Sequence, residues 1–210
     1  MTTLFDGLSK DTMNAPVYSR RRFIKTALAE MAFLVAATMA FPPFINAEST
    51  TTKKSTIVVG ALAKALRSIG GPVCLAAAVK LEANQSNTDS VYFHLRHAAL
   101  EASDAMVIAE ALKSLPKESH SALVSLSLSY NHALGDAGAI ALAQSLPPTI
   151  RELGLVNCGI GDAGGKAVLR WAKHATGLRI LCIEENQLSE KIKLQIVELM
   201  HRNAELSVVV

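Results

Sequence analysis

Several side chains in this 210-residue sequence are of the kinds that bind metals, attack substrates or transfer protons. His94 and His97 could ligate a metal ion, but residues three apart on a strand face opposite sides of it, which makes a poor chelate. Cys182 could act as a nucleophile, yet no glycine-rich elbow, oxyanion-binding turn or orienting acid accompanies it. Glu184 and Glu185 are adjacent, so on a strand they point in opposite directions and do not form an acid–base pair. These residues therefore predict no active site.

The remaining chemical motifs are equally incomplete. Residues 159–165 are rich in glycine but lack the Lys-Ser/Thr ending of a phosphate-binding loop. Cys74, Cys158 and Cys182 are spaced neither as a zinc site nor as a dense disulfide framework, so we interpret them as small buried side chains. We therefore expect a protein that is not an enzyme and that holds no cofactor and no metal.

Composition and charge limit the other functions. Of the residues, 50% are hydrophobic and 19% are charged, which suffices for one domain with a core and argues against general disorder. The formal net charge is +3, and several of the basic residues lie near the start of the chain. The rest of the chain has no cluster of Lys and Arg, which a nucleic-acid-binding protein needs for its contacts with phosphates. We therefore expect no nucleic-acid partner.

The beginning of the chain resembles a twin-arginine export signal. Residues 19–25 read Ser-Arg-Arg-Arg-Phe-Ile-Lys, close to the pattern Ser/Thr-Arg-Arg-x-Phe-Leu-Lys of such signals, and Arg20, Arg21 and Phe23 match it. An apolar stretch at 31–41 and two prolines follow, as in a signal peptide. This stretch is shorter than the roughly 20 apolar residues that span a membrane.

The resemblance implies a signal peptide over residues 1–47. Cleavage would fall after Ala47 and leave Glu48 as the first mature residue. The mature protein would then lie in the periplasm or the extracellular space. An uncleaved segment that anchors the chain in the membrane is the alternative.

A short motif occurs three times in the second half of the chain. It begins at Leu123, Ile150 and Leu178, 27 and 28 positions apart, and each copy follows the pattern L-x-x-L-x-L-x-x-N/C. The copies read LVSLSLSYN, IRELGLVNC and LRILCIEEN. Alternate leucines such as Leu126 and Leu128 point to the same side of a strand. Each copy therefore predicts a short strand with one buried face.

A helix is expected after each strand. Gly-Asp-Ala-Gly stands at both 135–138 and 161–164; its glycines suit the turn into a helix, and Asp136 is a candidate N-cap. Apolar residues then recur at helical spacing, and a last helix is expected at 191–200. A unit of one strand and one helix cannot bury its apolar face alone. Neighbouring units must therefore stack to complete the core.

These repeats resemble leucine-rich repeats of the ribonuclease-inhibitor type. The resemblance implies an α/β solenoid, a right-handed β–α superhelix with a parallel β-sheet on its concave face and helices on its convex face. It also implies that Asn131 and its counterparts hydrogen-bond to neighbouring backbone along the array, which would satisfy buried polar groups. Since such arrays serve as binding scaffolds, the resemblance implies a non-catalytic, protein-binding role.

Outside the signal, the chain divides into two parts. Residues 48–90 are predicted to form a helical cap, with helices at 57–69 and 72–83 and then a polar loop. Residues 91–210 are predicted to form the repeat domain, in which the tail at 206–210 could add an edge strand. The units of this domain are expected at about 91–122, 123–149, 150–177 and 178–205.

The outward-facing residues of the strands form the candidate binding site. Because side chains alternate along a strand, the residues between the buried leucines are expected on the concave face. Tyr92, Arg96 and Glu184 are the leading anchors, since aromatic and arginine side chains dominate binding hot spots. The other interpretation is that these are solvated positions of a structural repeat. The candidate residues are Tyr92, His94, Arg96, Ser125, Ser127, Ser129, Glu152, Val156, Ile180 and Glu184.

The sequence thus predicts an exported, non-catalytic protein that binds a protein or peptide partner through its concave face. It would meet a membrane only during export or through an uncleaved N-terminal anchor. A structural envelope protein that keeps this anchor is the alternative function, and an enzyme of unrecognised type is a third hypothesis.

Overall fold

The computed structural model describes residues 47–84 and 89–210. The proposed export signal, with Arg20, Arg21 and Phe23, lies outside the described residues, and so does part of the expected polar loop after residue 83. The proposed cleavage site falls at the start of the first helix.

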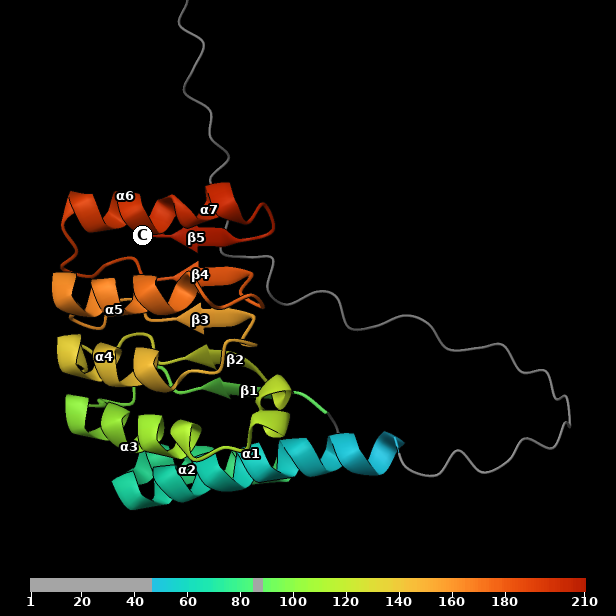
Figure 1. The fold of residues 1–210 in the computed structure, drawn as a ribbon. Helices are drawn as coiled ribbons and strands as arrows, with labels where there is room; N and C mark the ends of the chain where they lie inside the picture. The colour runs from blue at the N-terminus through green and yellow to red at the C-terminus, as the bar shows by residue number, and fades with distance from the viewer. Residues whose placement is uncertain (1–46, 85–88) are drawn as a thin grey trace, which may run out of the picture. The chain divides into compact units, whose positions relative to one another are not determined.

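Within the described ranges, five strands form one parallel sheet whose order follows the chain (Figure 1). The register places Leu126, Leu153 and Leu181 side by side on neighbouring strands. The tail forms the last strand, so the expected edge strand is present. The strands are β1 (Val91–His94), β2 (Leu123–Ser127), β3 (Glu152–Gly154), β4 (Ile180–Cys182) and β5 (Ser207–Val209).

A helical segment follows each of the first four strands and packs beside its neighbour from the adjacent unit, α3 on α4, α4 on α5 and α5 on α6 (Figure 1). This arrangement confirms the expected α/β architecture of stacked strand–helix units. The helix expected at 191–200 is divided at Glu198, which ends one helix and precedes a short second one. The helices are α3 (Ala102–Lys113), α4 (Gly135–Ser145), α5 (Asp162–Ala172), α6 (Glu190–Val197) and α7 (Leu199–Arg202), with a 3-10 helix, η2 (Lys117–Ala122), before β2.

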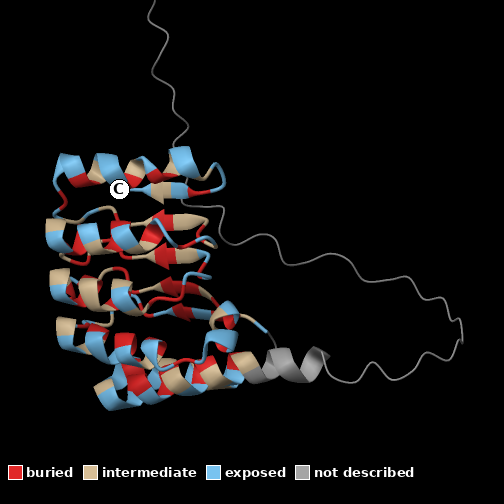
Figure 2. Ribbon diagram, viewed as in Figure 1, coloured by how far each residue is buried: buried red, intermediate tan, exposed pale blue. Residues whose placement is uncertain are grey.

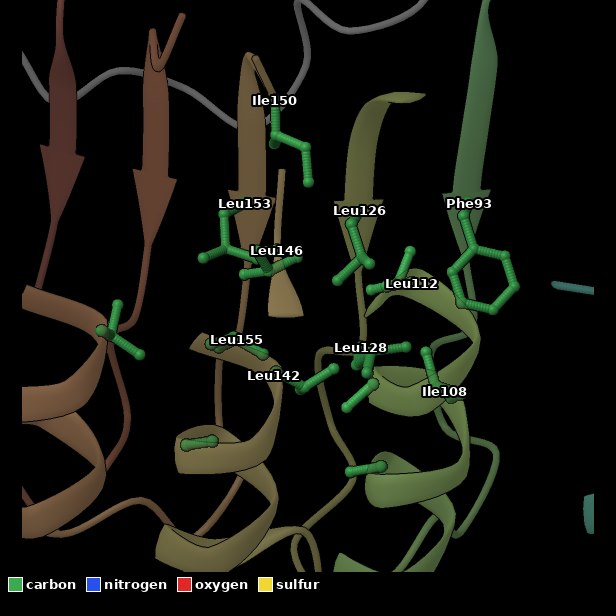
Figure 3. Close-up of a cluster of buried hydrophobic side chains, with 14 of the residues drawn as sticks. Phe93, Ile108, Leu112, Leu126, Leu128, Leu142, Leu146, Ile150, Leu153 and Leu155 are labelled. Carbon is green, nitrogen blue, oxygen red and sulfur yellow. The ribbon is translucent and has the colours of Figure 1, made fainter. Parts of the chain in front are cut away.

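The leucines of the motif fill the space between the sheet and the helices. Leu126 and Leu128 are fully buried, and Leu153 is 1% exposed. Figure 3 shows Leu126 and Leu128 beside Ile108 and Leu112 of α3 and Leu142 of α4, and Figure 2 shows that buried residues recur in every unit. The prediction that neighbouring units share one core is therefore confirmed.

In the described ranges, two α-helices precede the first strand, α1 (Ala47–Ile69) and α2 (Pro72–Ala83). α1 packs against α3, η2 and β1, and so covers the first unit. Gly70 and Gly71, with φ of 77° and 72°, end α1 as the sequence predicts. α1 begins ten residues before the expected start at Ile57, because its first turns are Ser, Thr and Lys without the apolar period on which the prediction depended.

A buried asparagine, Asn131, joins its unit to the one before it. The Asn131 side chain accepts hydrogen bonds from the N–H groups of Ala98 (2.9 Å) and Leu100 (3.1 Å). It donates to the carbonyl oxygens of Leu95 (2.9 Å) and Leu128 (2.7 Å). Only 1% of Asn131 is exposed, so these bonds satisfy backbone groups that water does not reach.

The same ladder continues in the later units. Asn186 accepts from the N–H groups of Cys158 and Ile160 and donates to the carbonyl oxygen of Leu155. Cys158 occupies the asparagine position of its own unit, and its thiol donates to the carbonyl oxygen of Leu128 at 3.2 Å. The hydrogen-bonded ladder that the family resemblance implied is therefore present.

The prediction that Asp136 caps its own helix is wrong. Asp136 lies in the first turn of α4, but its Oδ1 accepts hydrogen bonds from the N–H groups of Gly161 and Gly164, both at 2.8 Å, at the start of α5. Asp162 repeats this contact one unit later, accepting from the N–H (2.7 Å) and the hydroxyl (2.8 Å) of Ser189. The aspartate of each Gly-Asp-Ala-Gly turn thus caps the helix of the next unit and ties the two units together.

Candidate functional site

The sheet face opposite the helices carries all ten predicted site residues; we call it the open face. The strand register aligns them in rows that run across the sheet. Backbone hydrogen bonds beyond the strand ends extend the alignment, since His97 donates to Ser129 and Asn157 donates to Glu184. The rows are Tyr92, Ser125, Glu152, Ile180 and Ser207; His94, Ser127, Gly154, Cys182 and Val209; and Arg96, Ser129, Val156 and Glu184.

The β1 side of the open face is aromatic and basic. Tyr92 is 54% exposed, and its ring meets that of His94 edge-on at 6.5 Å between centroids. Past the end of β1, the His97 ring stacks on Tyr130 at 4.5 Å, and the Arg96 guanidinium lies 5.1 Å from the centre of the same ring. Tyr130 is a member of this cluster that strand alternation does not predict. Its φ of 65° turns it away from the side that strand alternation would give it.

In the middle of the open face, three of the predicted site residues are less exposed than expected. Ser125, Ser129 and Val156 are buried. Ser125 and Ser129 are each 2% exposed and Val156 is 6% exposed. The hydroxyl of Ser125 lies 2.7 Å from Nε2 of His94, and that of Ser129 accepts the Val156 N–H at 3.2 Å. These side chains are short and are covered by longer neighbours, so they can form only the floor of a binding site.

Gly154 leaves room for the neighbouring serine side chains at this site. A Cβ atom at Gly154 would lie 2.8 Å from the hydroxyl oxygen of Ser127 and 3.2 Å from that of Ser129. The two hydroxyls, which are 3.2 Å apart, occupy that space instead. Glycine at this strand position therefore lets neighbouring serines lie over the sheet.

The β3 and β4 side of the open face is acidic. Glu152 and Glu184 are half-buried, and Oε2 of Glu184 is buried without a hydrogen-bond partner among the described residues. Burial, assisted by the charges of Glu184 and Glu152, raises the pKa of Cys182 to about 11, while Arg96 acts in the opposite direction. The thiol is therefore protonated at neutral pH, which makes Cys182 a poor nucleophile.

His94 is neutral at neutral pH. Burial lowers the pKa of His94, the charge of Glu152 raises it, and Arg96 lowers it again, with burial the largest effect. His94 and His97 do not form a chelate, because His97 stacks on Tyr130 instead. In the part of the chain that the structure describes, no three His, Cys, Asp or Glu side chains are grouped in a way that could hold a metal ion.

The three cysteines are free thiols. Cys74 and Cys158 are buried, as the sequence analysis expects, and burial raises the pKa of each thiol. Cys182 is only partly buried because it belongs to the open face. None of the helices in the described ranges is both long and apolar enough to cross a membrane.

Comparison with protein families finds one match. Residues 120–143 and 147–169 fit a family model described as Leucine Rich repeat. These two segments contain β2 with most of α4, and β3 with most of α5. No curated protein matches the chain.

Proposed function

We propose that this leucine-rich repeat protein is a non-catalytic scaffold that binds a protein or peptide through its open face. Leucine-rich repeats generally serve protein binding, and the observation that carries the proposal is the exposed cluster at β1. Tyr92 and Arg96 project from this edge of the open face, and tyrosine and arginine are enriched among the residues that dominate binding energy.

We also assign the repeats to the ribonuclease-inhibitor-like type. The motif recurs every 27 or 28 residues, and the central units return through α4 and α5, which are full α-helices of 11 residues. Both features agree with the longer repeats of the leucine-rich repeat class.

Replacing Tyr92 and Arg96 together by alanine should weaken partner capture by at least about tenfold, because two hot-spot side chains are lost. Both side chains are exposed, so the melting temperature should stay unchanged. Proximity labelling of the full-length protein in its native host, followed by pull-down with purified variants, measures the effect. Arg170→Ala, on the exposed side of α5, is the matched control and should capture normally. Undiminished capture by the double variant would remove the open face as the binding surface.

We further propose that the chain is exported by the twin-arginine route. The match of Arg20, Arg21 and Phe23 to that pattern supports the proposal. Changing Arg20 and Arg21 to lysine should abolish export, since the motif is read as an arginine pair, whereas Arg22→Lys should leave it intact. Cell fractionation with mass spectrometry of the N-terminus measures both. Glu48 as the first residue supports the exported form; undiminished export of the double variant would exclude this route, and an intact Met1 in the membrane would favour the anchored envelope protein.

A further inference from the structure

The open face carries opposite charges on its two sides. Arg96 stands at the β1 side, next to Tyr130, whereas Glu152 and Glu184 stand on β3 and at the end of β4. Arg96 and Glu184 belong to the same row and are separated by Ser129 and Val156. With three strand spacings between them, their Cα atoms are about 14 Å apart.

Neither charge is neutralised within the described part of the chain. Arg96 makes no ion pair there, and its guanidinium lies over the Tyr130 ring. Glu184 Oε2 is shielded from water yet accepts no hydrogen bond. A carboxylate oxygen in this position is costly, and because Glu184 as a whole is only half-buried, a cationic group from outside that approaches the carboxylate would lower that cost.

The side chains between the charges are short. Ser127 and Gly154, which pair in register on neighbouring strands, are partly exposed there, whereas Ser125, Ser129 and Val156 lie beneath the surface. A segment of partner chain could therefore lie over them with side chains reaching toward both sides. Nucleic acid is disfavoured because its phosphates would meet Glu152 and Glu184.

Building on the binding role proposed above, we propose that the occupant of the open face is an extended peptide segment with an acidic side chain toward β1 and a basic side chain toward β4. The acidic group pairs with Arg96, and a lysine or arginine donates hydrogen bonds to Glu184. Tyr92, at the exposed edge, packs against the apolar part of the segment. The opposite charges fix the direction in which the segment lies across the strands.

A display library of random linear peptides, selected on the immobilised full-length protein, tests this assignment. Enriched peptides should contain both an acidic and a basic residue, and Arg96→Gln and Glu184→Gln should each weaken their binding by about tenfold. Glu184→Gln preserves side-chain size and Arg96→Gln leaves a shorter polar side chain, so thermal melting checks that each variant is folded. Removing the basic residue from the peptide should abolish the effect of Glu184→Gln, and removing the acidic residue should abolish that of Arg96→Gln.

The outcomes separate this inference from the proposed binding role. If peptides are enriched whose binding requires Tyr92 but is unaffected by Arg96→Gln and Glu184→Gln, the charge assignment is wrong while the open face remains the binding surface. If no enriched peptide depends on Tyr92, both proposals fail. The assignment would also be overturned if the effect of Glu184→Gln depended on the acidic residue of the peptide and not on the basic one.

Discussion

Leu153→Ala should lower the free energy of unfolding by about 4 kcal/mol, the upper part of the range for a buried leucine truncated to alanine. Leu153 is 1% exposed and lies on the central strand β3, in register with Leu126 and Leu181 of the flanking strands. Units on both sides of it hold the surrounding side chains in place, so the resulting cavity cannot collapse easily. Urea unfolding followed by circular dichroism measures the loss.

Leu194→Ala is the matched control for this substitution. Leu194 lies on α6 and is 68% exposed, so the same chemical change should alter stability by no more than about 0.5 kcal/mol. Equal losses for the two variants would mean that Leu153 is not buried between stacked units.

Asn131→Ala should lower the free energy of unfolding by about 3 kcal/mol, because the substitution leaves buried backbone groups without partners. Two N–H groups and two carbonyl oxygens lose their bonds. Three of these four groups belong to residues 95–100, the segment that follows the strand of the preceding unit. Hydrogen exchange of the Ala98 and Leu100 amides should therefore accelerate together with the loss of stability.

Asn84→Ala serves as the control for the asparagine ladder. Asn84 is exposed at the C-terminal end of α2, and its removal should change stability by no more than about 0.5 kcal/mol. If Asn131→Ala were as harmless as Asn84→Ala, the ladder would contribute nothing to the cohesion of the array.

The fold could be predicted from the sequence where one residue type repeats at a fixed interval. Leu126 and Leu153 mark the strands because their period and spacing reflect burial in every unit. The role of Asp136 could not be predicted in this way, because its partners are the backbone N–H groups of the next unit and not its own helix. The early start of α1 was missed for a related reason, since its polar first turns have no apolar period.

The sequence predicts which side of the sheet the candidate site residues occupy, but not how far each side chain is buried. Strand alternation places Ser125, Ser129 and Val156 on the open face, but it does not show that longer neighbours cover them. Tyr130 was missed because its positive φ interrupts the alternation directly after the strand. Asn157 and Glu185, which also directly precede a ladder residue, have positive φ as well, so the place in the motif and not the residue type marks such a position.

Site-specific photocrosslinking in the native host tests the central claim, that a partner lies on the open face, most directly. A photoreactive phenylalanine analogue at position 92 should give a covalent adduct with the partner, whereas the same analogue in place of Gln144, exposed on α4, should give none. An adduct at position 144 with none at position 92 would place the partner on the helices and contradict the account.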